Sequence, residues 1–165
     1  MKIFGFAGWS GSGKTTLIEQ VIPRFVLAGL KVSLIKHAHH RFDVDQPGKD
    51  SFRHRAAGCS EVLVTSGERW ALMHEMRGEQ EATLEDQIAR MSPCDLLLIE
   101  GYKRYPVPKL EIFRAANGKP LLHPQDEHIV AVATDTPVRS RLPQYGLEDY
   151  DAIAAFVLDT LELNR

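Results

Sequence analysis

The chain has 165 residues, of which 44% are hydrophobic and 25% are charged, and its formal net charge is -2. This size and composition are typical of one globular domain, so we expect residues 1–165 to form a single domain. The small negative charge argues against a nucleic-acid partner. Its two cysteines, Cys59 and Cys94, form no CxxC pair, and no apolar run approaches the roughly 20 residues that span a membrane. We therefore expect a cytoplasmic protein with no membrane segment.

The first predicted elements are a buried strand, KIFGFAG (residues 2–8), and an amphipathic helix, KTTLIEQVIPRFVLAG (14–29). Between them lies GWSGSGKTT (8–16), which satisfies the pattern G-x-x-x-x-G-K-S/T of a phosphate-binding loop. A strand before the motif and a helix after it are the context that such a loop requires. A chance glycine-rich turn is the alternative.

The residue types in this loop suit the binding of a nucleoside triphosphate. Glycines let successive backbone N–H groups turn toward phosphate oxygens, and the start of the helix adds further donors. We expect Lys14 to reach the β- and γ-phosphates and the Thr15 hydroxyl to bind Mg²⁺. The expected nucleotide-binding residues of the loop are Gly8, Gly11, Ser12, Gly13, Lys14, Thr15 and Thr16.

The strand expected next, KVSLIK (31–36), leads into a long polar loop over 37–51. Its HAHH stretch (37–40) has the side chains of a metal site, but the cysteine or carboxylate co-ligands are not spaced to complete one. We therefore expect Lys36 or His37 to face an anionic ligand. The acidic second half of the loop is either an element that senses the γ-phosphate or an ordinary solvated loop, and both interpretations stay open.

The middle of the chain predicts a short helix near 51–58, a β-hairpin over about 61–75 and a second helix near 83–92. The hairpin carries five large apolar side chains. They are Val62, Val64, Trp70, Leu72 and Met73. A lone two-stranded arm does not usually expose so much apolar surface, so we expect a dimerisation arm that packs in a homodimer interface. Folding back onto its own domain is the alternative.

A continuous apolar run, CDLLLIEG (94–101), is typical of a strand buried on both faces, and it carries two carboxylates. Because the phosphate loop follows the C-terminal end of its own strand, a useful carboxylate on a parallel neighbour must also be C-terminal. Asp95 is about 16 Å from that end, whereas Glu100 lies there. We expect Glu100 and Thr15 to hold Mg²⁺, and Glu100 and Lys14 to be the catalytic residues. A solvated glutamate at a strand end is the alternative.

Two further strands, KLEIFR (109–114) and HIVAVATD (128–135), and an amphipathic helix within 146–164 complete the chain. Strands that alternate with helices predict an α/β fold, a phosphate-loop NTPase-type mainly parallel sheet flanked by helices, with the antiparallel hairpin as an extension. Asp135 ends the last strand, where a carboxylate can accept both adjacent donors of guanine; a turn or helix-cap role is the alternative. The usual guanine motif Asn-Lys-x-Asp is missing, since NGKP (117–120) does not match it, so GTP and ATP both stay open.

Five stretches of the chain resemble the MobB family of molybdopterin-guanine dinucleotide biosynthesis adaptor proteins. They are GWSGSGKTTL, LIKHAHHRFDVDQPGKDS, RWALM, LLLIEGYK and AVATD, in that order between residue 3 and about residue 160. The resemblance implies a phosphate-loop α/β fold, a homodimer, GTP binding and weak GTP hydrolysis. It also implies assistance to the guanylyltransferase that attaches GMP to molybdopterin. Whether molybdopterin itself contacts the chain stays open.

The resemblance also assigns roles by position. The phosphate-binding residues would be Gly11, Gly13, Lys14, Thr15 and Thr16. Glu100 would face Mg²⁺ and Asp135 would bind the base, while Lys36, Lys49 and Lys103 match family positions whose roles the residues do not explain. Any catalysis would be at most a slow GTPase. A small-molecule kinase is the alternative, because the same loop and carboxylate suit phosphoryl transfer. A metal-insertion GTPase would need a convincing metal site.

Overall fold

The computed structural model describes residues 1–38 and 42–164. These residues form two compact units. We call the first, residues 1–38 with 93–164, the sheet unit, and the second, residues 42–92, the hairpin unit. The expectation of a single domain concerns how the two units are joined, and it stays a prediction.

The sheet unit is built on six strands. They are β1 (Lys2–Ala7), β2 (Val32–Lys36), β5 (Leu96–Glu100), β6 (Lys109–Phe113), β7 (Ile129–Thr134) and β8 (Gln144–Gly146). Their order is β2-β5-β1-β6-β7-β8, and every neighbouring pair is parallel. The predicted α/β fold with a mainly parallel sheet is therefore confirmed. We did not predict β8, because its three residues show no apolar alternation.

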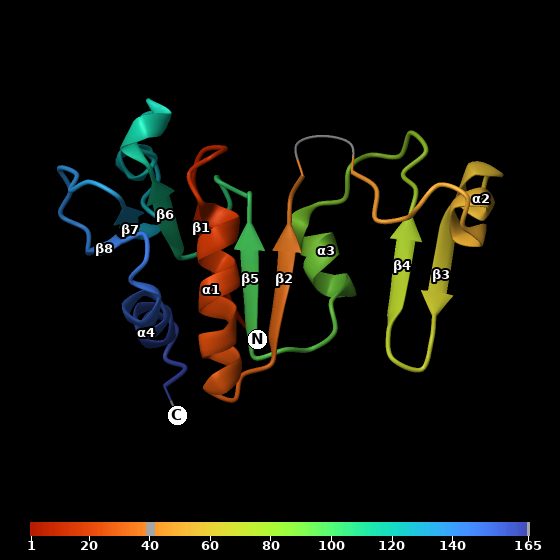
Figure 1. Ribbon diagram of the computed structural model, residues 1–165, viewed down its shortest axis with the longest axis horizontal. Coiled ribbons are helices and arrows are strands. Elements are labelled where there is room, and N and C mark those ends of the chain that lie inside the picture. The colour runs from red at the N-terminus through yellow and green to blue at the C-terminus, as the bar shows by residue number, and fades with distance from the viewer. Residues whose placement is uncertain (39–41, 165) are drawn as a thin grey trace. The chain divides into compact units, whose positions relative to one another are not determined.

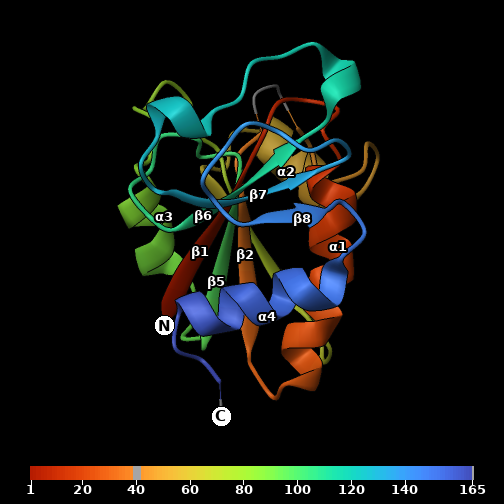
Figure 2. The same ribbon diagram turned by 90° about the vertical axis from the view of Figure 1, so that its left-hand side faces the viewer.

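Two helices of the sheet unit, α1 (Lys14–Leu27) and α4 (Tyr150–Thr160), pack against each other (Figures 1 and 2). The first begins and ends close to the predicted bounds and continues through Pro23. The second begins at Tyr150 rather than near 146, because residues 144–146 form β8 instead. Two short 3₁₀ helices, Ala115–Asn117 and His123–Gln125, lie between β6 and β7.

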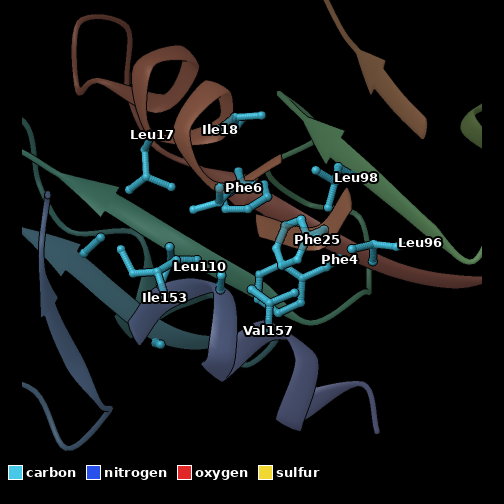
Figure 3. Close-up of a cluster of buried hydrophobic side chains, with 14 of the residues drawn as sticks. Phe4, Phe6, Leu17, Ile18, Phe25, Leu96, Leu98, Leu110, Ile153 and Val157 are labelled. Carbon is cyan, nitrogen blue, oxygen red and sulfur yellow. The ribbon is translucent and has the colours of Figure 1, made fainter. Parts of the chain in front are cut away.

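Apolar side chains from both helices and the central strands meet in one core (Figure 3). They include Phe4, Phe6, Leu17, Ile18, Phe25, Leu96, Leu98, Leu110, Ile153 and Val157. Each fully buried side chain of this kind contributes roughly 1.5–3 kcal/mol to folding. This core fixes the start of α1 and the ends of the strands, which are the parts that carry the predicted site.

The hairpin unit contains the predicted antiparallel pair, which is confirmed as β3 (Glu61–Thr65) and β4 (Trp70–His74). It also contains α2 (Asp50–Ala56), which contacts β3, and α3 (Leu84–Arg90). Thr83 caps α3 with a reciprocal hydrogen-bond pair to Asp86, which explains where that helix starts. In the parts of the chain that the structure describes, no helix is long and apolar enough to cross a membrane.

Candidate functional site

The glycine-rich loop joins β1 to α1 at the C-terminal ends of the parallel strands (Figure 1). Gly11 and Gly13 adopt the left-handed region, with φ values of 79° and 94°, which side chains with a Cβ rarely adopt. At Gly8 an added Cβ would lie 2.5 Å from the carbonyl oxygen of Ile112. These glycines therefore let the loop turn tightly against β6.

The start of α1 has the properties of an anion-binding site. Gly13 is the N-cap residue, no side chain caps the first turn, and that turn contains no acidic residue. The first N–H groups of a helix have no partner within the helix and carry a partial positive charge. Within the described helix, these donors are left for a ligand such as a phosphate.

Lys14 lies over the loop. Its Nζ donates to the carbonyl oxygens of Gly8 at 3.0 Å and Trp9 at 2.8 Å. Burial lowers the pKa of the Lys14 ammonium, because desolvation penalises the charged form. The ammonium is thus held at the mouth of the loop, where the sequence predicts contact with the β- and γ-phosphates.

Three lysines surround one carboxylate at this site. The negative charge of Glu100 opposes the fall in the pKa of Lys14, and the positive charges of Lys103 and Lys36 lower this pKa further. Lys103 also places its Nζ 4.0 Å from the centre of the Trp9 ring, a cation–π contact. Three ammonium groups and one carboxylate leave an excess of positive charge, which favours a polyanionic ligand.

Glu100 and Thr15 lie side by side, as the geometric argument from the sequence requires. Glu100 pairs in register with Phe6 of β1, and its Oε1 accepts a hydrogen bond from the Thr15 hydroxyl at 3.1 Å. An octahedral Mg²⁺ with oxygen ligands at about 2.05 Å places neighbouring ligands about 2.9 Å apart. These two oxygens therefore fit as neighbouring ligands. Asp95 lies at the other end of β5, where it accepts from the backbone N–H of Lys31.

A cavity of about 420 Å³ adjoins the loop, within the size range of small-molecule sites. The residues that line it come from the loop, from α1, from the ends of β6 and β7 and from the segment before α4. They include Ser12, Gly13, Thr16, Arg114, Asp135 and Glu148. The Ser12 hydroxyl is buried and has no hydrogen-bond partner within residues 1–38 and 42–164. A buried donor without a partner is costly, so a ligand in this cavity would relieve that cost.

Asp135 lines the same cavity as the loop residues Ser12 and Gly13. Its Oδ1 accepts a hydrogen bond from the backbone N–H of Ala115 at 3.0 Å, which fixes the carboxylate at the end of β7. Each carboxylate oxygen has about two acceptor sites, so this bond leaves acceptors for a base. Asp135 and three of the expected phosphate-binding residues, Ser12, Gly13 and Thr16, therefore line one cavity.

Sequence reasoning missed Arg114, which directly follows β6. A Cβ added to Gly13 would lie 3.5 Å from Arg114 Nη2, so this guanidinium lies at the start of α1. The argument that selected Glu100 at the end of β5 also applies to β6, which neighbours β1 on the other side. Applied there, the same reasoning would have found this arginine.

Sequence reasoning also missed the contact between the loop and residues 117–120. The Trp9 Nε1 donates to the carbonyl oxygen of Pro120 at 2.8 Å, and Asn117 Nδ2 donates to that of Ser10 at 3.3 Å. The NGKP stretch, which does not match the guanine motif, thus stabilises the phosphate loop through these two hydrogen bonds. No spacing in the sequence predicts this contact, because more than 100 residues separate the partners.

The histidine-rich stretch divides between described and undescribed residues. His37 places its ring 4.9 Å from that of Tyr102, and its carbonyl oxygen lies 3.0 Å from a Cβ added to Gly101. His39 and His40 lie outside the described residues, so the metal interpretation of this stretch is not tested. Among the residues that are described, no group of three His, Cys, Asp or Glu side chains could hold a metal. Lys49 lies in the hairpin unit, as the N-cap residue of α2.

Comparison with known proteins gives consistent matches. A family model described as Molybdopterin guanine dinucleotide synthesis protein B (MobB) matches residues 3–135. The molybdopterin-guanine dinucleotide biosynthesis adapter protein of Escherichia coli (strain K12) is 40% identical over 97% of this chain and 93% of its own. The protein of the same name from Haemophilus influenzae is 41% identical over 94% of this chain and 86% of its own.

Solved structures show the same fold. The crystal structure of Bacillus subtilis MobB matches with a TM-score of 0.77 and 26% identity, and the match covers 98% of both chains. A crystal structure of molybdopterin-guanine biosynthesis protein B matches with a TM-score of 0.76 and 25% identity, over 96% of this chain and 99% of the other. The likeness therefore extends over nearly the whole chain.

Proposed function

Since the chain belongs to the MobB family of molybdopterin guanine dinucleotide synthesis proteins, we propose that it is a GTP-binding adaptor with slow GTPase activity. Its role is in the biosynthesis of the guanine dinucleotide form of the molybdenum cofactor. The partner is the guanylyltransferase that attaches GMP to molybdopterin, and the adaptor presents GTP to it. The two cysteines, Cys59 and Cys94, are free, which supports a reducing, cytoplasmic setting.

One observation carries the nucleotide part of this proposal. The uncapped start of α1 and three lysines converge on the space next to the phosphate loop. Backbone N–H groups, the α1 dipole and the ammonium of Lys14 together favour a polyphosphate over a singly charged anion. Burial strengthens these interactions, because it removes competing water.

The base would occupy the far side of the same cavity. Asp135 lies there, and a carboxylate can accept both adjacent donors of guanine, whereas adenine offers no such pair. A site built to accept hydrogen bonds rejects a ligand that lacks the donors, because its own acceptors then stay unpaired. This chemistry supports GTP over ATP.

Thr15 and Glu100 would hold the Mg²⁺ that accompanies the nucleotide. Bound there, Mg²⁺ would neutralise charge on the β- and γ-phosphates. Glu100 is nearly buried, with 8% of its side chain exposed. Its carboxylate is therefore held in one position whether or not a ligand is bound. Lys14 would stabilise the charge on the phosphate that is released, which is the part of hydrolysis that this chain supports.

The hairpin supports a homodimer. Leu63 and Leu72 lie opposite each other in β3 and β4, and their exposed fractions are 59% and 50%. Trp70 lies on the same face of the hairpin and is 64% exposed. A two-stranded hairpin is marginally stable by itself, and this apolar face gives a second copy of the chain a surface to cover.

The test of the nucleotide proposal is a calorimetric titration of the full-length protein with GTP and with ATP, each with and without Mg²⁺. We expect GTP to bind at least about tenfold more tightly than ATP, because adenine lacks the two adjacent donors that the Asp135 carboxylate can accept. Hydrolysis should be slow and should change when the guanylyltransferase is added. Equal affinity for both nucleotides would remove the guanine assignment. Rapid phosphoryl transfer to a small acceptor would favour a kinase instead.

A further inference from the structure

Lys36 is the last residue of β2, and it lies directly opposite Glu100 in the register of the neighbouring strand β5. Its Nζ is 3.4 Å from Glu100 Oε2 and 3.4 Å from the Thr15 hydroxyl oxygen. These are the same two side chains that fit Mg²⁺, and they are also hydrogen-bonded to each other. The ammonium of Lys36 therefore lies in contact with both expected metal ligands.

The other two lysines of the cluster have different partners. Lys14 donates to carbonyl oxygens of the loop, and Lys103 lies over the Trp9 ring. Within the described residues, Lys36 is the only lysine that forms an ion pair with Glu100. A positive charge between two oxygen ligands is what the site needs when no divalent ion is present, because a buried carboxylate without a counter-charge is costly.

We propose that Lys36 is a resident cation of the metal position, which serves as the counter-charge of Glu100 and of the bound triphosphate whenever no divalent ion is bound there. This inference depends on the proposed nucleotide site. It explains why a lysine stands at the end of β2, a position that the sequence alone did not explain. It also implies that this protein binds GTP with little dependence on Mg²⁺.

The difference in burial between the two partners shows which of them moves. Half of the Lys36 side chain is exposed, at 51%, whereas Glu100 is 8% exposed. A lysine ammonium on a flexible four-carbon stem can turn into water at small cost, and a buried glutamate cannot. Lys36 therefore leaves the site when a divalent ion binds to Thr15 and Glu100, and the two cations compete for one place.

The experiment compares the protein with Lys36→Met, using a nonhydrolysable GTP analogue and calorimetry in excess EDTA and in saturating Mg²⁺. The measured quantity is the ratio of the dissociation constant in EDTA to that in Mg²⁺. We expect the ratio to rise by about tenfold or more in Lys36→Met, because the metal-free site then lacks its counter-charge. Linkage requires the nucleotide complex of this variant to bind Mn²⁺ more tightly, which electron paramagnetic resonance can measure.

Lys103→Met is the matched control, since it removes the same charge from the same cluster without touching Thr15 or Glu100. It should weaken binding in both media and change the ratio by less than about threefold. Lys36→Gln should repeat the effect of Lys36→Met, and melting curves check that each variant is folded.

Two outcomes would overturn this inference and leave the proposed nucleotide site standing. One is an unchanged ratio in both Lys36 variants, and the other is an equal rise in Lys103→Met, which would point to general loss of charge. If the unaltered protein binds the analogue in neither medium, the proposed nucleotide site fails and this inference fails with it.

Discussion

The sheet unit and the hairpin unit differ in which side chains they bury and which they leave exposed. In the sheet unit, Lys109 and Glu111 are 1% exposed, and each is fully paired. Lys109 forms an ion pair with Asp126 at 2.7 Å, and Glu111 accepts from two backbone N–H groups between β6 and β7. In the hairpin unit, by contrast, no residue of α2, β3 or β4 is buried, within the described segment 42–92.

The hairpin unit keeps its charges in a network near the surface. Arg55 pairs with Asp43, Asp45 and Glu75, which joins the segment before α2 to the residue that follows β4. Several of its large apolar side chains are exposed instead, among them Leu63, Trp70 and Leu72. The sheet unit therefore has a core that can hold a ligand site in place, whereas the hairpin unit would gain stability if another surface covered its apolar face.

The largest effect is expected in the sheet unit, from Lys14→Ala. Loss of this ammonium should weaken GTP binding at least about 100-fold, because it removes a charge-assisted contact from a partly desolvated site. Calorimetry measures the affinity, and circular dichroism checks the fold. Lys31→Ala, at the opposite end of β2, is the matched control and should bind GTP normally. An unchanged affinity in Lys14→Ala would count decisively against the site.

The second effect is expected in the hairpin unit, from the double substitution Leu63→Glu and Leu72→Glu. Two carboxylates on the exposed apolar face should dissociate the homodimer, which sedimentation velocity detects as a fall in mass, while GTP affinity per chain should stay the same. Leu27→Glu makes the same change at an exposed leucine of α1 and is the matched control. A monomeric unaltered protein, or a double variant that stays dimeric, would remove the interface from this face.

A smaller effect is expected from Asp135→Asn, at the base side of the cavity. The asparagine oxygen can still accept from the N–H of Ala115, so the local fold should persist. The side chain can no longer accept both guanine donors, so the preference for GTP over ATP should fall by about tenfold. Competition between the two nucleotides in one calorimetric series measures this ratio. An unaltered ratio would remove Asp135 from base binding.

The sequence predicted the parts of the sheet unit that local pattern determines. The strand, the glycine-rich loop and α1 follow from residue types at fixed spacing, and the choice of Glu100 over Asp95 follows from strand direction. Contacts between segments far apart in the chain were not predictable in this way. Asn117 and Pro120 form hydrogen bonds to the loop, and Lys36 pairs with Glu100. Both sets of contacts depend on the order of the strands in the sheet, which local sequence patterns do not reveal.

The hairpin unit shows a different limit of sequence reasoning. Alternation and turn residues predicted the β3–β4 pair itself, because its signals are local. The Arg55 network was not predicted, since Asp43 and Asp45 stand in a polar loop that has no periodicity. A charge cluster of this kind depends on the path of the loop in the folded protein. Many loops of similar composition would not bring their carboxylates next to an arginine.

The smallest expected effect is a difference between the hairpin unit and the sheet unit in how their stability depends on pH. A hydrogen bond to Glu61, and a weaker one to Glu79, raise the pKa of His74 above its ordinary value of about 6.5. Because the folded-state pKa is raised, protonated His74 stabilises the hairpin fully at pH values below the ordinary pKa. This contribution to stability is lost as the pH rises through the folded-state pKa. Hydrogen exchange of β3 and β4 should therefore become faster relative to the sheet unit as the pH rises from below about 6.5 through the folded-state pKa of His74, after correction for intrinsic rates. Glu61→Gln and His74→Gln should each flatten this difference, and because His74 is close to solvent the change should be small. If the difference persists in both variants, the pH dependence comes from elsewhere in the hairpin unit.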